Sequence, residues 1–237
     1  MSQLIINKLS ITHNNKQLVN LIKENESPIK IRNSIALVGQ SGSGKSLTLK
    51  TILQMTPKEM DISFDYQCDF ELNSHNIGFI PQNPFTSLSP MTRISKQFFC
   101  DTEKMERLLK LVKIDLSFKD KFPSQLSGGQ LQRIVIAIAL SKNPKLLLLD
   151  EPTTALDVKS KSSILEILVE LKKQLNFIII FVSHDIKSIQ NICEQILILK
   201  DGIIYEKGDT MEVFKNPQHT YTKELIESNF NNREFRI

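Results

Sequence analysis

Eight consecutive residues constrain the fold of this 237-residue chain more than any other feature: Gly39, Gln40, Ser41, Gly42, Ser43, Gly44, Lys45 and Ser46. They match the pattern G-x-x-x-x-G-K-[ST]. A short apolar run at residues 34–38 precedes them, and apolar residues at helical spacing follow at residues 46–55. A strand, a glycine-rich turn and a helix in this order direct backbone N–H groups and the positive end of the helix dipole at phosphate oxygens. The pattern therefore predicts a phosphate-binding loop.

The side chains of this loop suit a nucleotide. Lys45 brings a full positive charge to the β- and γ-phosphates, and the hydroxyl of Ser46 is a suitable ligand for Mg²⁺. We expect the nucleotide contacts to extend to Leu47, so that they cover residues 39–47. A glycine-rich turn that binds nothing is the alternative, and the flanking strand and helix disfavour it.

Two acidic residues follow another apolar run, at residues 146–149. An enzyme with such a loop needs an acid on a neighbouring strand to hold the water shell of Mg²⁺, and Asp150 fits this role. Glu151 leaves the strand, where it can polarise a water for attack on the γ-phosphate. Two acids that only end a strand before Pro152 are the alternative, which the phosphate-binding loop makes less favourable.

A second glycine pair lies in Ser127-Gly128-Gly129-Gln130, before a predicted helix. Exposed N–H groups and a hydroxyl at the start of a helix can bind an anion. An ordinary helix cap followed by a flexible turn is the alternative. The segment lies far along the chain from Lys45, so it need not reach the phosphate-binding loop of its own chain.

Composition and length favour a folded protein with one domain and room for a subdomain: 41% of residues are hydrophobic and 24% are charged. The net charge of +4, without a dense Lys/Arg run, favours a mildly basic cytosolic protein over a nucleic-acid or membrane-surface binder. Three scattered cysteines predict neither a disulfide framework nor a zinc site, and fit a reducing compartment. We expect no signal peptide and no membrane span, because no apolar run approaches the roughly 20 residues of a membrane helix.

Apolar strands alternate with helices, which predicts a mainly parallel sheet buried on both faces. A hairpin is expected around Asp201-Gly202. Short strands are expected before residue 31, strands at 34–38, 77–80, 146–149 and 177–182, and helices at 46–55, 103–112, 131–140 and 162–174.

These segments together resemble the ATP-binding cassette (ABC) ATPases. The phosphate-binding loop matches the Walker A motif of that family, and LSGGQ at residues 126–130 matches its signature sequence. LLLLDEPTTALD at residues 146–157 matches Walker B and the D-loop. FIPQNP places Gln82 in the Q-loop, and FVSHD places His184 at the switch histidine. The five motifs occur in the family's order, and the resemblance covers residues 4–228.

The resemblance implies an α/β fold with a P-loop NTPase core, whose sheet is mainly parallel. An N-terminal antiparallel β subdomain and a helical signature subdomain at about residues 83–143 complete it. One ABC ATPase domain would cover residues 1–228, with a C-terminal tail at 229–237. ATP and Mg²⁺ are the implied cofactors.

The resemblance also implies residue roles. ATP would lie between two cassettes in head-to-tail arrangement, so that the signature of one subunit meets the Walker A of the other. Glu151 would be the general base, His184 would contact the γ-phosphate, and Gln82 would link Mg²⁺ and the attacking water to the helical subdomain. Asp157 would touch the partner's Walker A. The implied signature contacts are Ser127, Gly128, Gly129 and Gln130, and the implied Mg²⁺ ligands are Ser46, Gln82 and Asp150.

One departure from the family concerns adenine. Many relatives stack an aromatic residue on the base near the N-terminal strands, but ITHNN at residues 11–15 has no Phe, Tyr or Trp. Either His13 stacks on the base, or the base is held weakly. The other histidines outside the motifs, His75 and His219, have no spacing that builds a metal site, so we expect surface or packing roles.

Two stretches resemble the peptide and nickel importers. NPFTSLSPMTRI at residues 83–94 matches a region that, in those importers, helps to form the groove for a coupling helix of the membrane subunit. VFKNPQHTYTKELIES at residues 213–228 also matches this branch. The compact length looks most like the nickel-import ATPases, with dipeptide or oligopeptide import as the alternative. A cassette ATPase outside transport is less favoured, because there is one cassette and no room for long coiled coils.

The implied partners follow from this branch. They are a second ABC ATPase subunit, in a homodimer or heterodimer, two transmembrane permease subunits and, indirectly, an extracytoplasmic substrate-binding protein. No nucleic-acid partner is expected. The chain would be peripheral, on the cytoplasmic face of the inner (cell) membrane.

Overall fold

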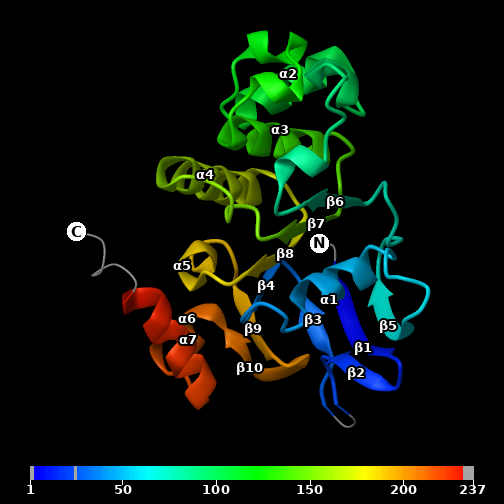
Figure 1. Cartoon of the computed structure of the whole chain (residues 1–237), viewed down its shortest axis with the longest axis vertical. Helices are drawn as coiled ribbons and strands as arrows, with labels where there is room; N and C mark the ends of the chain where they lie inside the picture. The colour runs from blue at the N-terminus through cyan, green and yellow to red at the C-terminus, as the bar shows by residue number, and fades with distance from the viewer. Residues whose placement is uncertain (1–2, 24–25, 232–237) are drawn as a thin grey trace. The chain divides into compact units, whose positions relative to one another are not determined.

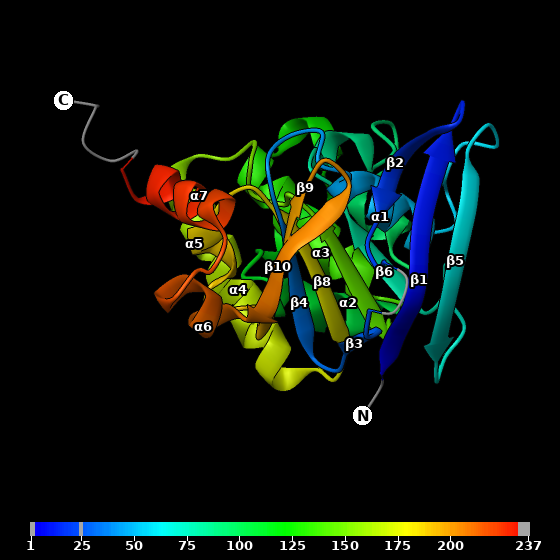
Figure 2. The ribbon, with the colours of Figure 1, turned by 90° about the horizontal axis from the view of Figure 1, so that it is seen from below.

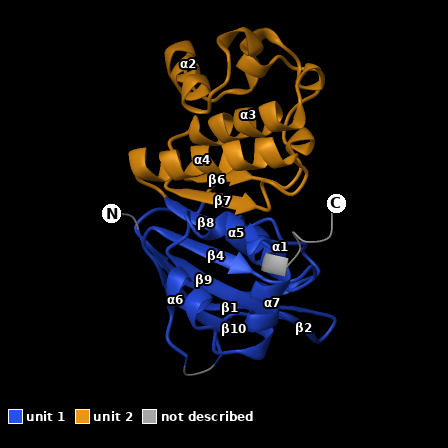
Figure 3. Ribbon diagram, turned by 90° about the vertical axis from the view of Figure 1, so that its left-hand side faces the viewer, with its two compact units in different colours: residues 1–72, 178–237 blue, residues 73–177 orange. Residues whose placement is uncertain are grey.

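The computed structural model describes residues 3–23 and 26–231, and the chain divides into two compact units (Figure 3). One unit comprises residues 1–72 and 178–237, and the other comprises residues 73–177. The first unit contains β1 (Leu4–His13), β2 (Lys16–Asn20), β3 (Ile29–Ile31), β4 (Ser34–Val38), α1 (Lys45–Ile52), β5 (Asp61–Cys68), β8 (Ile178–Ser183), α5 (Ile186–Ile189), β9 (Gln195–Lys200), β10 (Ile203–Asp209), α6 (Thr210–Lys215) and α7 (Thr220–Asn231). The second contains β6 (Ile77–Ile80), the 3₁₀ turns η1 (Pro84–Thr86), η2 (Ile94–Gln97), η3 (Leu116–Asp120) and η4 (Pro123–Gln125), and α2 (Thr102–Leu111), α3 (Gly128–Leu140), β7 (Leu146–Asp150) and α4 (Val158–Gln174).

Strand β4 is the centre of the sheet in the first unit, and all five of its residues are buried. It runs parallel to β8 on one side and to β9 on the other (Figure 1). An apolar run that packs on both faces is typical of such a central parallel strand. The strand ends at Val38, so the parallel sheet delivers the chain directly into the glycine-rich loop and α1.

The predicted hairpin is confirmed, since β9 and β10 pair antiparallel. Its turn places Asp201 at φ 50° and Gly202 at φ 77°. Two consecutive residues with positive φ give the turn the twist that flanking strands require, which is why Asp-Gly predicts a hairpin. Strand β10 then meets the N-terminal strands through a parallel pairing of Ile203 with Asn20 of β2.

The N-terminal strands are antiparallel, as the fold class predicts. Strand β1 pairs antiparallel with β2, β3 and β5, and Figure 2 shows β5 alongside β1. Asn14 and Asn15 form the turn between β1 and β2 at φ 50° and 60°. Strand β5 was missed by the search for continuous apolar runs, although DISFDYQC alternates polar and apolar residues as a half-buried strand does, and its side chains are only partly buried or exposed.

In the second unit, β6 and β7 are parallel, with Ile77 opposite Leu146. Residues 83–143, all of which the structure describes, contain α-helices and 3₁₀ turns and no strand. Helices α3 and α4 begin three and four residues before the predicted starts at 131 and 162. The reason is capping, since Ser127 and Asp157 accept hydrogen bonds from the first N–H groups of these helices.

The C-terminal helices belong to the first unit. Helix α7 packs against α5 and β10 (Figure 1), and the predicted domain boundary at residue 228 falls inside it. Residues 232–237 of the predicted tail lie outside the described residues. The buried Glu206 carboxylate on β10 anchors the segment before α7, because its oxygens accept from the N–H groups of Gln218 at 2.9 Å and His219 at 3.2 Å.

Cys68, Cys100 and Cys193, all of which the structure describes, form no disulfide. In the described part of the chain, no helix has both the length and the apolar character to cross a membrane.

The Glu206 anchor has a defined pH dependence. Burial alone would raise the pKa of Glu206, but the groups that face its carboxylate, of which the N–H of Gln218 has the largest effect, outweigh it and hold the pKa below its ordinary value of 4.5. A carboxyl group with a depressed pKa in the folded state stabilises the fold above its unfolded pKa, and this contribution is lost as the pH falls through the folded value.

We therefore expect Glu206→Gln to lower the free energy of unfolding at pH 7 by about 1–2 kcal/mol, since charge-assisted hydrogen bonds become neutral ones. The difference from the unsubstituted protein should shrink as the pH falls below 4.5, because Glu206 itself becomes neutral. Urea unfolding across this pH range measures both effects. Glu212→Gln, at an exposed position on α6, is the matched control. An undiminished difference at about pH 3 would contradict the anchor.

Candidate functional site

The glycine-rich loop of the first unit folds around the ammonium group of Lys45. Gly42 and Gly44 have φ values of 82° and 96°, which residues with a β-carbon rarely adopt. Lys45 is only 5% exposed, and its Nζ donates hydrogen bonds of 2.8 Å to the carbonyls of Gly39 and Gln40. Because a buried ammonium needs acceptors, these two carbonyls stabilise the charge inside the loop.

Helix α1 starts at this loop without a side-chain cap. Its N-cap residue is Gly44, which has no side chain that could accept from the N–H groups that open the helix. Helices α2, α3 and α4 are capped by Asp101, Ser127 and Asp157. A helix start with a glycine N-cap next to a buried cation is suited to bind a phosphate, whose oxygens accept from the N–H groups.

His184 lies in the same unit, directly after β8, and is exposed. The turn that carries it is held by its neighbours. Ser183 Oγ accepts from the N–H of Asp185 at 2.9 Å, and the Asp185 carboxylate caps α5 by accepting from the N–H of Lys187 at 3.0 Å. The turn therefore presents the imidazole at the surface from an ordered backbone. His13 ends β1, where its Nδ1 is 3.1 Å from the carbonyl oxygen of Glu59.

In the second unit, Asp150 is the last residue of β7 and Glu151 turns away from the strand. Glu151 has φ 48°, in the left-handed region. A residue other than glycine in this region costs of order 1–3 kcal/mol, and such residues cluster at functional sites. The carboxylate of Glu151 accepts a hydrogen bond of 3.0 Å from the hydroxyl of Thr154. The strained turn fixes where this acid leaves the sheet.

The Ser-Gly-Gly-Gln segment forms a capping box at the start of α3. Ser127 Oγ accepts from the N–H of Gln130 at 3.3 Å, and Gln130 Oε1 accepts from the N–H of Ser127 at 2.9 Å. A β-carbon on Gly129 would lie 2.5 Å from Ser160 Oγ, so glycine is needed for α3 to approach α4. The cap that the sequence left as an alternative is present, and the predicted nucleotide contact of these residues stays a prediction.

Asp157 caps α4 in a similar way. Its Oδ1 accepts from the N–H groups of Lys159 and Ser160, each at 3.0 Å. The hydroxyl and then the N–H of Ser160 lower the pKa of Asp157. Ser160 packs against Gly129 and also donates its N–H to Asp157. The D-loop and the signature segment therefore form one packed cluster.

A hollow in the surface lies beside the Q-loop. Gln82 is exposed and follows β6, and Asn83 caps the 3₁₀ turn η1. The hollow has a volume of about 160 Å³, and its lining includes Phe79, Leu88, Phe99, Ile138 and Lys142. Nearby in the sequence, Phe85 is 55% exposed and Met91 is 85% exposed. Exposed apolar side chains beside a hollow favour a docking surface for another protein.

The predicted site residues divide between the two units. The first unit contributes residues 39–47 and His184, and the second contributes Gln82, Asp150, Glu151, the signature segment and Asp157. The oxygen donors expected for Mg²⁺, a hydroxyl, an amide and a carboxylate, are the donor types that this ion prefers.

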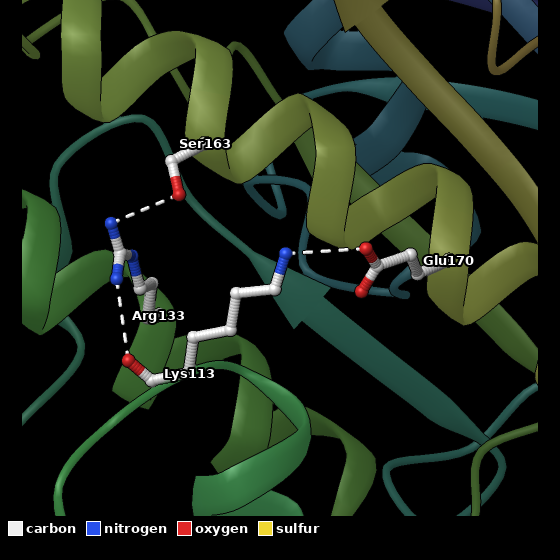
Figure 4. Close-up of polar contacts among 4 residues, drawn as sticks. All are labelled: Lys113, Arg133, Ser163 and Glu170. Atoms are coloured by element: carbon white, nitrogen blue, oxygen red, sulfur yellow. Dashed lines mark hydrogen bonds and ion pairs between the residues drawn. The ribbon is translucent and has the colours of Figure 1, made fainter.

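The sequence pattern did not single out Arg133, which ties three elements of the second unit together (Figure 4). It lies on α3, where its Nη2 donates to Ser163 Oγ of α4 at 3.0 Å and its Nη1 donates to the carbonyl of Lys113 at 3.3 Å. The Lys113 ammonium forms an ion pair with Glu170 of α4, at 3.2 Å. The only available signal was the position of Arg133 three residues after the signature on the same helix.

Arg133→Lys should lower the free energy of unfolding by about 1–2 kcal/mol, because a single ammonium cannot replace a guanidinium that bonds two sites in different directions. Glu170→Gln removes the half-exposed ion pair and should cost under about 1 kcal/mol. Urea unfolding of both variants measures the difference. A larger loss in Glu170→Gln would show that the surface ion pair, and not Arg133, holds the helices together.

Comparisons with known proteins agree with these motifs. A family model described as ABC transporter matches residues 26–154, which include the glycine-rich loop, Gln82, the signature segment and the two acids. The oligopeptide transport ATP-binding protein OppD of Bacillus subtilis is 38% identical over 223 residues, covering 82% of this chain and 62% of that protein. This chain therefore spans less than two thirds of that relative.

The metal-staphylopine import system ATP-binding protein CntD of Staphylococcus aureus is 34% identical over 219 residues, which cover 81% of each chain. Among solved structures, cbiO1 from Clostridium perfringens, described as part of the ABC transporter complex cbiONQ, matches with a TM-score of 0.75 and 26% identity. The match covers 98% of this chain and 95% of that chain, which confirms the predicted α/β fold class. The chain therefore belongs to the ABC transporter family and is one of its ATPases.

Proposed function

We propose that this chain hydrolyses ATP to power an importer. The loop around Lys45 carries the proposal, because it combines a buried ammonium with a helix start whose N-cap residue is a glycine. On binding ATP, Lys45 would exchange loop carbonyls for phosphate oxygens, and the N–H groups at the start of α1 would bind the phosphates. The proposed contacts cover residues 39–47.

Bound Mg²⁺ would neutralise charge between the phosphates. Ser46, Gln82 and Asp150 would hold it through oxygen atoms, in agreement with its donor preference. Glu151 would accept a proton from the attacking water as general base, and His184 would donate a hydrogen bond to the γ-phosphate. The strained backbone of Glu151, at φ 48°, supports this role, because residues in this conformation cluster at functional sites.

A second cassette would complete each site. We propose that Ser127, Gly128, Gly129 and Gln130 of one subunit face the ATP held by the Walker A of another, and that Asp157 touches that Walker A. The packed cluster of these residues on α3 and α4 supports a shared role. The pair would be a homodimer or a heterodimer, formed by a single ATPase domain over residues 1–228 of each chain.

The hollow beside residues 83–94 would receive a transmembrane permease subunit, with two permeases in the whole importer. Closure of the two cassettes on ATP would move the permeases, and hydrolysis would reopen the pair. In this proposal the chain would be a peripheral subunit on the cytoplasmic face of the cell membrane. A substrate-binding protein outside the membrane would act indirectly, and no step involves nucleic acid.

For the cargo we propose nickel, with peptides as the second candidate. The Staphylococcus aureus relative, named for import of a metal complex, matches this chain over 81% of both lengths, which supports a metal. The Bacillus subtilis relative, named for oligopeptide transport, has the higher identity of 38% and supports peptides. Residues 83–94 and 213–228 resemble both groups.

Glu151→Gln should lower the rate of ATP hydrolysis about 10²- to 10⁴-fold, because the general base is lost while the phosphate-binding loop is intact. Its affinity for Mg-ATP should change less than about threefold. Lys45→Ala should instead weaken Mg-ATP binding about 10- to 100-fold, through loss of charged hydrogen bonds. Phosphate release and nucleotide titration measure these effects.

Glu166→Gln, on the exposed side of α4, is the matched control for the loss of one carboxylate. Full hydrolysis by Glu151→Gln would exclude it as the base, and normal ATP binding by Lys45→Ala would contradict the phosphate-binding loop.

Uptake in cells tests the cargo. Cells whose only copy carries Glu151→Gln should take up at least about tenfold less radiolabelled nickel, since transport depends on hydrolysis. Uptake of a labelled dipeptide should not change. Loss of dipeptide uptake alone would assign the chain to peptide import, and unchanged uptake of both would exclude both cargoes unless a second ATPase substitutes. Cells carrying Glu166→Gln control for expression.

A further inference from the structure

We propose that Tyr221, on the C-terminal helix α7, is a positioning residue for ATP binding. Its hydroxyl holds the peptide group that also binds Lys45, so α7 keeps the phosphate-binding loop in its binding shape. The inference rests on the proposed role of Lys45. All the groups involved lie in the first unit.

The contact is made through one peptide plane. The N–H of Gln40 donates to the hydroxyl oxygen of Tyr221 at 3.2 Å. The carbonyl of the same peptide group, that of Gly39, accepts from Lys45 Nζ at 2.8 Å. Because the peptide is planar and rigid, fixing one edge orients the other. A cation on the carbonyl also polarises the N–H, which strengthens its bond to the hydroxyl.

Tyr221 is itself held in place. It is 7% exposed, and its ring meets that of Tyr205 edge to face, with centroids 5.7 Å apart. The ammonium of Lys200 lies 4.8 Å from the centroid of the Tyr221 ring. Buried ring contacts leave the side chain little freedom, so the hydroxyl stays opposite the Gln40 N–H without a further loss of entropy.

Helix α7 is held by hydrogen bonds near both of its ends. Before its first turn, the Glu206 carboxylate binds the N–H groups of Gln218 and His219. Toward its other end, Asn229 Oδ1 accepts from the N–H of Ile186, two residues after His184, at 3.4 Å. Figure 1 shows α7 beside α5. One helix thus contacts the Walker A loop and the segment after the switch histidine.

The arrangement matters when ATP arrives. If Lys45 turns from the Gly39 carbonyl to a phosphate, that peptide loses one of its two fixed partners. The bond from Gln40 to Tyr221 then keeps the peptide in place, so the loop binds ATP without reorganising. Without the hydroxyl, the peptide can rotate and part of the binding free energy is lost in ordering it.

Tyr221→Phe tests this, because it removes the hydroxyl and keeps the ring. We expect the dissociation constant of the full chain for Mg-ATP to rise about 3- to 10-fold, the amount that one neutral hydrogen bond contributes. The amide proton of Gln40 should move upfield in the ¹H–¹⁵N spectrum of the nucleotide-free protein, since its acceptor is gone. Tyr205→Phe, in the same aromatic cluster, is the matched control and should change neither value.

Several outcomes would overturn the proposal. An unchanged dissociation constant in Tyr221→Phe, with or without a lower melting temperature, would leave Tyr221 a merely structural residue. Equal effects in Tyr221→Phe and Tyr205→Phe would assign the change to the ring cluster and not to the hydroxyl. Lys45→Ala distinguishes failure of the proposed function from failure of the role of Tyr221. Normal ATP binding by Lys45→Ala would refute the proposed function. Weak binding by Lys45→Ala together with normal binding by Tyr221→Phe would refute only the role of Tyr221.

Discussion

A buried ammonium group dictates much of the structure around it. Lys45 is almost inaccessible to water, so acceptors inside the protein must stabilise its charge, and the carbonyls of Gly39 and Gln40 do so. These carbonyls face inward only because the chain turns through positive φ at Gly42 and Gly44. The buried strand β4 and the start of α1 fix the ends of this turn, and Tyr221 of α7 accepts a hydrogen bond from the N–H of Gln40 within it. A loop built this way is preorganised for the proposed function, in which phosphate oxygens would replace carbonyl oxygens around the Lys45 ammonium.

Continuous apolar runs made the inner strands predictable. Strands β4 and β6 have the predicted bounds, because Gly39 and Pro81 end their runs. Strand β5 was not predicted, although its strict alternation of polar with apolar residues is the period of a half-buried strand; only continuous apolar runs were assigned as strands in that region. The starts of α3 and α4 were placed too late because the apolar periodicity begins after the capping residues, whose side chains and not their hydrophobicity define the helix ends.

The site shows the same limit. Motifs that are contiguous in sequence, such as the loop at residues 39–46, can be identified from the sequence alone. Tyr221 meets Gln40 across 181 positions of sequence, and Arg133 meets Ser163 across 30. No sequence motif marks either residue, because most tyrosines and arginines on helices lie at the surface or only pack against neighbours. Only the three-dimensional arrangement identifies them. The two residues act in different units: Tyr221 bonds to the glycine-rich loop of the first unit, and Arg133 joins α3, which begins with the signature segment, to α4 in the second unit.

The side chains that cap α3 and α4 differ in the further hydrogen bonds that they can make. Ser127 uses a lone pair to accept from Gln130, so its hydroxyl proton is left for an outside acceptor. Asp157 has only lone pairs and can meet only donors. Ser127 can therefore meet either an acceptor, through its proton, or a donor, through its second lone pair, whereas Asp157 requires N–H or O–H groups opposite it. A surface that places an oxygen opposite Asp157 would be repelled there, so of the two caps it is the aspartate that discriminates between covering surfaces.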